Sequence, residues 1–366
     1  MLLRLIEKII PRIGGPAFDV SFYPRRYHSW KKYVNLCVAL VQTKLCYLFG
    51  FTLNISRPSR LTVDVTNLCN LHCPFCPTGK GEKGRERSSL SFTDFQALFD
   101  QFSGYLYRMI LCNWGEPLLN KELCKMIRYA EQGRVFTLLS TNLNVHFDDN
   151  TASELIDSGL SQLSASLDGV TQETYAKYRR GGRLELALEN LERLVAAKRA
   201  ARSDKPEIVW SYTVFRHNEH EIDLAKEKAK EIGVDRIEFR TGFAEDPSWF
   251  ARGDYPYIEF GVDQRICREL WLEAVIHPDG GIGPCCRQFF KADDFGNMAS
   301  GSFQREWNNR SFRQARRLFS RRRRGSPPED AYCLDCIRVD NFEKSLTDSR
   351  WRFQKTDLKK LRTIYK

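Results

Sequence analysis

Three cysteines at spacings of four and three positions, Cys69, Cys73 and Cys76, constrain this chain more than any other feature. They follow residues 61–65, where apolar and polar residues alternate and β-branched residues are frequent, so we expect a strand leading into the cysteine loop. Thiolates are soft ligands that suit iron–sulfur clusters or zinc. Because an ordinary cluster is closed by four cysteines, a loop that supplies only three predicts an iron with an open position. A zinc site with His72 as fourth ligand is the alternative.

The pattern C-x3-C-x2-C, with Phe75 before the third cysteine, resembles the signature of the radical S-adenosylmethionine (radical SAM) superfamily. The resemblance implies a [4Fe–4S] cluster held by Cys69, Cys73 and Cys76, with its fourth iron chelated by S-adenosylmethionine (SAM). In that family, an electron from the cluster cleaves SAM to a 5′-deoxyadenosyl radical, which abstracts hydrogen from the substrate. The resemblance also implies that Phe75 lies near the adenine of SAM.

Length and composition favour an intracellular protein of more than one part. The chain has 366 residues, 42% of them hydrophobic, and a formal net charge of +11. This length suits two domains or one barrel with an appendage. Its twelve cysteines are too sparse for a small disulfide scaffold and cluster at metal-ligand spacings, which favours a reducing compartment. We therefore expect a cytoplasmic protein.

Residues 1–58 are expected to form a helical N-terminal segment. The pattern over residues 1–10 is amphipathic and is followed by no cleavage site. The apolar stretch 33–51 is interrupted by Lys44, which leaves arms shorter than the about 20 residues that span a bilayer. Packing on the main domain is the preferred interpretation of this segment, and docking on an anionic membrane surface is the alternative.

Strands and helices alternate over residues 59–243. The expected strands are residues 61–65, 107–111, 135–140, 162–166, 208–214 and 236–240, and the expected helices are residues 92–102, 121–132, 151–158, 185–202 and 219–232, with a short helix after Thr171. Six repeats of this kind predict a parallel sheet in an α/β fold, wound into a partial (β/α)6 TIM-like barrel. Sites in such barrels lie at the carboxyl ends of the strands.

The resemblance extends to the ends of the later strands. It implies that SAM is bound by residues matching the family's strand-end motifs, namely Gly115, Glu116, Asn142, Ser166 and Arg179. Trp114 stands where the family motif has its first glycine, and the arginine could be Arg180 instead of Arg179. Asn218 is a weaker SAM-binding candidate. The general base is unknown, with Asp168, His277 and Asp279 as candidates by position only.

Residues 244–340 resemble the SPASM or twitch-type appendage of radical SAM enzymes. The resemblance implies one auxiliary [4Fe–4S] cluster, held by Cys267, Cys285, Cys333 and Cys336. Cys286 is expected to be a spare thiol that could exchange with Cys285. A zinc site made by the same four cysteines is the alternative. Residues 341–366 are expected to form a basic tail.

Arginines are dense between the cysteines of this appendage, at positions 305, 310, 313, 316, 317 and 321–324. A charge run of this kind is typical of a solvated helix face, and it lacks the interleaved aromatics of single-strand binders. We expect no nucleic-acid partner. An anionic lipid surface or a phosphorylated substrate suits the basic surface better.

The chain is therefore expected to be a radical SAM, iron–sulfur, oxidoreductase-like enzyme. Its expected reaction is an oxidation or rearrangement of a small molecule such as a sugar, glycolipid or lipid precursor. A maturase of a ribosomal peptide and a zinc-stabilised binding protein without redox chemistry are the alternatives. The expected electron donor is a flavodoxin or ferredoxin, and the expected location is the cytoplasm, with the option of peripheral contact at the inner membrane surface.

Overall fold

The computed structural model describes residues 20–21, 23–253, 255, 267, 269–321, 332–333 and 336. The helix expected over residues 1–10, the basic tail 341–366 and residues 256–266 lie outside these described residues.

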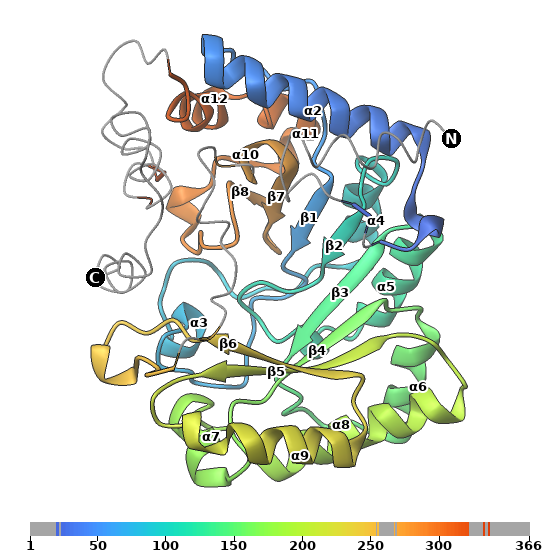
Figure 1. Cartoon of the computed structure of the whole chain (residues 1–366). Helices are drawn as coiled ribbons and strands as arrows, with labels where there is room; N and C mark the ends of the chain where they lie inside the picture. Colours follow the sequence, from blue (N-terminus) through green and yellow to red (C-terminus); the bar gives the residue numbers. More distant parts are fainter. Residues whose placement is uncertain are drawn as a thin grey trace.

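Six parallel strands form the main sheet, as the sequence predicts (Figure 1). They are β1 (Arg60–Val63), β2 (Arg108–Ile110), β3 (Phe136–Thr141), β4 (Gln162–Ser166), β5 (Glu207–Val214) and β6 (Arg236–Thr241). Neighbours in sequence are neighbours in the sheet, and each pair is parallel. Because β1 and β6 lie apart in the strand order, the barrel is partial and not closed.

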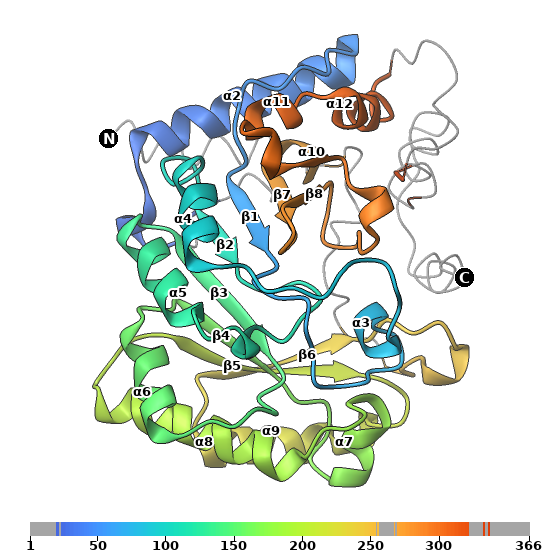
Figure 2. The same ribbon diagram turned by 180° about the vertical axis from the view of Figure 1, so that it is seen from behind.

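Helices alternate with these strands, and those from Phe92 onward line the outer side of the curved sheet, whereas the short helix Pro77–Lys80 lies in the loop that follows β1 (Figures 1 and 2). They are α3 (Pro77–Lys80), α4 (Phe92–Asp100), α5 (Leu123–Gln132), α6 (Asp149–Asp157), α7 (Gln172–Tyr178), α8 (Leu184–Ala200) and α9 (Ile222–Ile232). Local capping sets several of their starts: Ser91, Asp148 and Thr171 each accept a hydrogen bond from a backbone N–H in the first turn. Short 3-10 turns cover Arg25–Tyr27, Pro117–Leu119, Glu219–Glu221, Pro247–Trp249, Lys291–Asp293 and Met298–Ser300.

The appendage continues the sheet of the barrel. It contributes α10 (Glu269–Leu272), β7 (Glu273–Ile276), β8 (Gly281–Gly283), β9 (Gly296–Asn297), α11 (Phe303–Glu306) and α12 (Arg310–Arg317). Strand β7 lies parallel beside β1, with Arg60 opposite Glu273 and Val63 opposite Ile276. Strands β8 and β9 then follow antiparallel. The nine strands thus form one sheet, in which the strand that precedes the cysteine loop is also the contact to the appendage.

The N-terminal segment contributes α2 (Trp30–Phe49), capped by Ser29 and ended by Gly50 with a φ of 79°. This helix lies across the end of the sheet where β1 begins, next to α11 and α12 (Figure 1). The Cys46 thiol contacts the Arg316 carbonyl at 3.4 Å, so α2 packs on the appendage as well as on the barrel. Among the helices of the described residues, none has both the length and the apolar character needed to cross a membrane.

One arginine of the predicted solvated run is buried instead. The guanidinium of Arg316 donates to the Leu270 carbonyl at 2.9 Å and to the Thr52 carbonyl at 3.3 Å. It lies within 5.4 Å of the ring centroids of three aromatic side chains, Trp271, Trp307 and Phe312. The interpretation of the whole run as a solvated face was wrong at this position, because an arginine can be buried when backbone carbonyls and aromatic faces replace water.

Candidate active site

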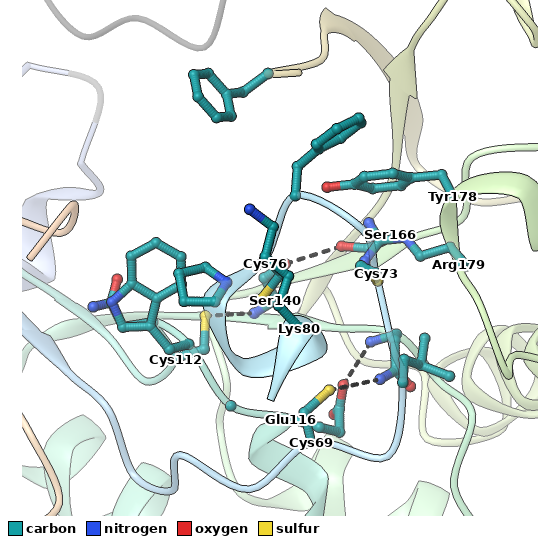
Figure 3. Close-up of a pocket in the computed structure, with 18 of the residues that line it drawn as sticks. Cys69, Cys73, Cys76, Lys80, Cys112, Glu116, Ser140, Ser166, Tyr178 and Arg179 are labelled. Carbon is teal, nitrogen blue, oxygen red and sulfur yellow. Dashed lines mark hydrogen bonds between the residues drawn. The ribbon is translucent and has the colours of Figure 1, made fainter. Parts of the chain in front are cut away.

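A cavity of about 530 Å³ lies at the carboxyl ends of the parallel strands, where the barrel pattern predicts a site. Cys69, Cys73 and Cys76 all line it, and Figure 3 shows them along one segment of chain. Cys73 is buried, and the other two thiols are half-buried. Burial raises the pKa of Cys69 to about 11 and also raises the pKa of Cys73. A bound metal would therefore have to displace protons from these thiols.

The local chain path holds the cysteine loop in place. Cys76 caps α3, and its N–H donates to the Cys73 carbonyl at 3.2 Å. A Cβ at Gly79 would lie 2.5 Å from the Cys73 carbonyl oxygen, so only glycine allows the first turn of α3 to approach the loop so closely. The His72 N–H donates to the Arg180 carbonyl at 2.9 Å, which ties the loop to the chain after α7.

The donor set of this loop fits an iron–sulfur cluster with one open iron, because the loop supplies three thiols to the cavity wall and its histidine lies outside that wall. His72 is exposed and is absent from the cavity wall. Among the described residues, no three His, Cys, Asp or Glu side chains converge on a point where a single metal ion could bind.

Phe75 belongs to an aromatic cluster beside the cysteines. Its ring centroid lies 5.0 Å from that of Trp249 and 6.3 Å from those of Tyr178 and Phe215. Phe75 and Tyr178 both line the cavity. Flat aromatic surfaces next to a polar cavity suit a planar heterocycle such as an adenine.

The turn after β2 packs directly on the cysteine loop. A Cβ at Gly115 would lie 1.8 Å from the Thr66 carbonyl oxygen, so no other residue fits there. The Glu116 N–H donates to the Leu68 carbonyl at 2.7 Å. Both Glu116 carboxylate oxygens accept hydrogen bonds, from the Thr141 hydroxyl at 2.6 Å and from the Asn142 N–H at 2.7 Å. Burial raises the pKa of Glu116.

The Asp64 carboxylate holds the backbone of the same turn after β2. It follows β1, is buried, and its Oδ1 faces the backbone N–H groups of Asn113, Trp114 and Gly115 at 3.1, 3.3 and 3.4 Å. Burial raises the pKa of Asp64 to about 7, although the three N–H groups oppose that shift. The sequence analysis missed this residue, and the only signal was a carboxylate inside an otherwise apolar and β-branched run.

Asn142 and Ser166 also line the cavity. The Asn142 side-chain amide lies 3.9 Å from the Cys69 sulfur and donates to the Asn70 side chain at 3.1 Å. The Ser166 hydroxyl lies 3.1 Å from that of Ser140. These contacts bring the ends of β3 and β4 together at the wall of the cavity (Figure 3).

Arg179 lines the cavity, whereas Arg180 is exposed and does not. The Arg179 Nε donates to the buried Asp168 carboxylate at 2.6 Å. Burial opposes the charged guanidinium, but the Asp168 carboxylate outweighs it and holds the pKa of Arg179 well above its usual value. A fixed cation therefore faces the cavity and could pair with a carboxylate.

Asn218 and the three general-base candidates, Asp168, His277 and Asp279, do not line the cavity, and each forms hydrogen bonds or an ion pair with other residues. Asp168 holds Arg179 and the Thr213 N–H. His277 shares a hydrogen bond with the buried Gln288 side chain, and Asp279 pairs with Arg85 at 2.6 Å. The Asn218 amide donates to the carbonyls of Asp168 and Thr213, so it braces the end of β5.

Among the appendage cysteines, Cys285 lies near Cys286 and Cys333, and Cys333 lies near Cys336. The Cys285 thiol is close enough to Cys286 and Cys333 for their charges to raise its pKa, after burial as the main cause. Cys333 and Cys336 share a turn, in which the Cys336 N–H donates to the Cys333 carbonyl at 3.3 Å. Cys267 is buried at the start of this region. Four cysteines in one region are the number of ligands that a closed iron–sulfur cluster needs.

Trp114 connects the cavity to the appendage. Its indole N–H donates to the Gln288 carbonyl at 2.9 Å, and its ring meets that of Phe289 edge-on at 5.7 Å. Cys112 also lines the cavity, and burial raises its pKa to about 12. Cys112 belongs to no recognisable motif, and the contact of Trp114 with the appendage has no sequence signal.

Two family models match this chain. Residues 63–229 match the model of the radical SAM superfamily, and residues 267–337 match an iron–sulfur cluster-binding domain of the SPASM type. The chain belongs to the radical SAM superfamily of enzymes and carries a C-terminal SPASM domain. Its cofactors are SAM, a SAM-binding [4Fe–4S] cluster and an auxiliary iron–sulfur cluster.

Individual relatives are distant. The chain is similar to the mycofactocin maturase MftC of Mycobacterium ulcerans, with 29% identity over 47% of this chain and 44% of that protein. It is also similar to a GTP 3′,8-cyclase of Hydrogenovibrio crunogenus, with 29% identity over 37% of this chain and 42% of that protein. The chain spans about half the length of the curated relatives it matches.

Among solved structures, the chain resembles SuiB of Streptococcus suis bound to S-adenosylmethionine. The TM-score is 0.56 at 14% identity, over 78% of this chain and 72% of that one. This likeness supports the fold, a partial barrel with a SPASM-type region.

Proposed function

We propose that this enzyme cleaves SAM reductively and uses the resulting 5′-deoxyadenosyl radical to abstract hydrogen from a small molecule. The substrate class we favour is a sugar, glycolipid or lipid precursor, and the outcome an oxidation or rearrangement. One observation carries the proposal: a single cavity is lined by the three loop cysteines, an aromatic side chain, a fixed guanidinium and the polar strand ends. Its volume of about 530 Å³ lies within the range of small-molecule sites.

Each residue has a role that follows from its place. Cys69, Cys73 and Cys76 would hold the cluster, whose bound SAM supplies the radical chemistry. Phe75 would lie against the adenine. Arg179, held by Asp168, would pair with the SAM carboxylate.

The remaining SAM-binding candidates act through backbone and amide groups. Gly115 would let the chain approach the SAM amino group, while Glu116 holds the turn at Asn142 in position. Asn142 and Ser166 would bind the polar part of SAM from the ends of β3 and β4. None of the described residues that line the cavity stands out as a general base, so we assign none.

Cys267, Cys285, Cys333 and Cys336 would hold the auxiliary cluster, and we propose that it relays electrons during turnover. The contact between Trp114 and the Gln288 carbonyl supports this role, because it links the wall of the cavity to the turn that follows Cys285. A Cys333→Ala variant should still cleave SAM but lose product turnover. Unchanged product formation by that variant would remove the relay role.

Modification of a ribosomal peptide is the second candidate. A maturase is among the relatives, and a structure of SuiB bound to its precursor peptide SuiA is among the similar folds, with a TM-score of 0.55 over 84% of this chain and 74% of that one, at 14% identity. A flavodoxin or ferredoxin is the proposed donor, and the cytoplasm, with peripheral membrane contact, is the proposed location.

The test is anaerobic reconstitution with iron and sulfide, followed by reduction in the presence of SAM. We expect a brown protein that forms 5′-deoxyadenosine, measured by chromatography. Cys73→Ala should abolish this product, whereas Cys124→Ala, which changes a thiol remote from the cavity wall, should not. A colourless zinc protein, or a Cys73→Ala variant with the parent rate, would contradict the proposal.

A further inference from the structure

The outer side of the N-terminal segment exposes an unusual amount of apolar surface. Of the twelve large hydrophobic side chains exposed in the described residues, nine lie between positions 30 and 55, with exposed fractions from 39% to 68%. They are Trp30, Val34, Val41, Leu45, Leu48, Phe49, Phe51, Leu53 and Ile55. Surface of this kind, gathered in one place, typically marks an interaction site.

Helix α2 carries its part of this surface on one face. Val34, Val41, Leu45 and Leu48 recur at spacings of seven, four and three residues, which places them on one side of a helix. The opposite side is also apolar and is buried, with Tyr33, Leu36 and Leu40 in the core. The helix therefore has two apolar sides, and packing on the protein accounts for only one of them.

In the segment after α2, the apolar side chains are exposed and the polar side chains are buried, which is the reverse of the usual arrangement. Residues 51–56 alternate, but Phe51, Leu53 and Ile55 point outward, while Thr52, Asn54 and Ser56 are buried. The Asn54 N–H donates to the Asn308 side chain at 2.7 Å, and its carbonyl accepts from the side chains of Gln304 and Asn308 at 2.8 Å each. These hydrogen bonds hold the polar side chains inward. Because the side chains of an extended segment alternate, the apolar side chains must then face outward.

Hydrogen bonds join the helix to this segment. The Gln42 side chain donates to the Leu53 carbonyl at 2.9 Å and accepts from the Ser56 N–H at 3.1 Å. The outer face of α2 and residues 51–55 thus form one continuous surface, which we call the outer apolar face.

The charge around the outer apolar face is of one sign. Residues 20–63 contain seven Lys and Arg but no Asp or Glu, and residues 307–321 contain five Arg but no acidic residue. Arg310, Arg313 and Arg317 of α12 are exposed. Arg321 joins α12 to α2, because its N–H donates to the Tyr47 carbonyl at 2.9 Å and its guanidinium lies 4.7 Å from the Tyr47 ring centroid.

We propose that the outer apolar face docks on an anionic lipid surface, with the arginines of α12 contacting lipid headgroups. An interfacial helix needs an apolar face for the acyl boundary and basic side chains for anionic headgroups, and both are present here. Helix α2 runs along one end of the molecule with α12 beside it (Figures 1 and 2), so both can reach one plane. Association of two copies through this face would bring two basic surfaces together, which like-charge repulsion disfavours. The inference concerns where the enzyme works and is independent of its substrate.

The test is co-sedimentation of the reconstituted full chain with vesicles. We expect binding to phosphatidylcholine vesicles that contain phosphatidylglycerol, little binding to phosphatidylcholine alone, and a decline as salt is raised. The combined variant Val41→Ser, Leu45→Ser, Ile55→Ser should lower the partition coefficient at least about tenfold, since even one buried aliphatic side chain is worth about that factor. Arg313→Gln with Arg317→Gln should weaken the preference for anionic vesicles.

Leu224→Ser is the matched control, because Leu224 is 53% exposed on α9, away from this face. It should bind vesicles like the parent, and all variants should form 5′-deoxyadenosine at the parent rate, which shows that they fold. Three results would overturn the proposal. The first is unchanged vesicle binding by the triple Ser variant, and the second is a dimer in light scattering that this variant dissociates while the parent binds no vesicles. The third is vesicle binding that appears only after residues 1–19 are deleted, which would mean that these residues cover the face.

Discussion

At the scale of single residues, Asp64 shows how the site is held. One carboxylate oxygen accepts from three successive backbone N–H groups, and so it sets the path of the turn that carries Gly115 and Glu116. The turn has no freedom on its other side, where Gly115 touches the Thr66 carbonyl. Asp64 is therefore a positioning residue, which acts on SAM through the turn.

Asp64→Ala should weaken SAM binding by about tenfold or more, because buried N–H groups left without an acceptor cost about 1–3 kcal/mol each. Asp64→Asn keeps an acceptor oxygen and should bind SAM nearly as the parent does. The measurement is equilibrium dialysis of SAM with the reconstituted protein, alongside iron content, which both variants should retain. Equal losses in the two variants would show that charge, and not the acceptor, is what matters.

At this scale, the sequence predicted those site residues that belong to a motif with a recognisable spacing. The three loop cysteines and the strand-end motifs all reach the cavity wall, because each lies at the carboxyl end of a strand or on the segment that follows it. The choice between Arg179 and Arg180 needed the end of α7, where a one-residue shift turns a side chain from the cavity to the surface. The place of Cys112 in the cavity wall and the contact of Trp114 with the appendage were not predicted, because both depend on segments distant in the sequence.

At the scale of elements, one buried arginine joins the loop after α3 to the appendage through two ion pairs. Arg85 bonds to Asp279 at 2.6 Å and to Asp294 at 2.5 Å, and its side chain is only 2% exposed. The two aspartates come from the region of β8 and β9, so this arginine fixes the appendage against the segment that follows the cysteine loop.

Arg85→Ala should lower the free energy of unfolding by about 3–5 kcal/mol, because it leaves the largely buried Asp294 without its cation and Asp279 with only the exposed Lys291. The thermal midpoint of the reconstituted protein is the measurement. Arg305→Ala is the control: Arg305 lies 3.9 Å from Glu306 with a side chain 69% exposed, and such surface pairs contribute about 0–1 kcal/mol. Similar midpoints for the two variants would contradict the prediction.

Strands and helices of the barrel were predicted nearly to their observed ends, because apolar periodicity is a local property. The predicted strand at residues 236–240 is observed as Arg236–Thr241, and the helix predicted over 92–102 as Phe92–Asp100. The pairing of β7 with β1 could not be predicted, because it joins segments more than 200 residues apart and leaves no periodic trace. The burial of Arg316 escaped prediction for the same reason.

At the scale of the whole molecule, the shared sheet means that the appendage is part of the core. Strand β1 has β2 on one side and β7 on the other. Removal of β7 would leave the backbone groups on one side of β1 unpaired, and an unpaired strand edge of this kind promotes aggregation.

A chain that ends after residue 243 should therefore appear mainly in the insoluble fraction when it is expressed. The control is the full chain with Cys267→Ser and Cys333→Ser, which removes auxiliary-cluster ligands but keeps β7, and it should remain in the soluble fraction. Centrifugation and immunoblotting give the measurement. A well-behaved, monomeric truncated chain would show that the barrel folds without the appendage.

Helix α2 lies where β1 begins, and the cavity lies where β1 ends. A protein resting on a bilayer through α2 would hold its reaction chamber turned to the aqueous side, at a height set by the length of the barrel. A substrate anchored in that same bilayer could reach the cavity only if its reacting atom lay at the far end of a long headgroup that extends into water. The orientation thus selects for long hydrophilic chains, or for freely diffusing molecules, over compact lipids.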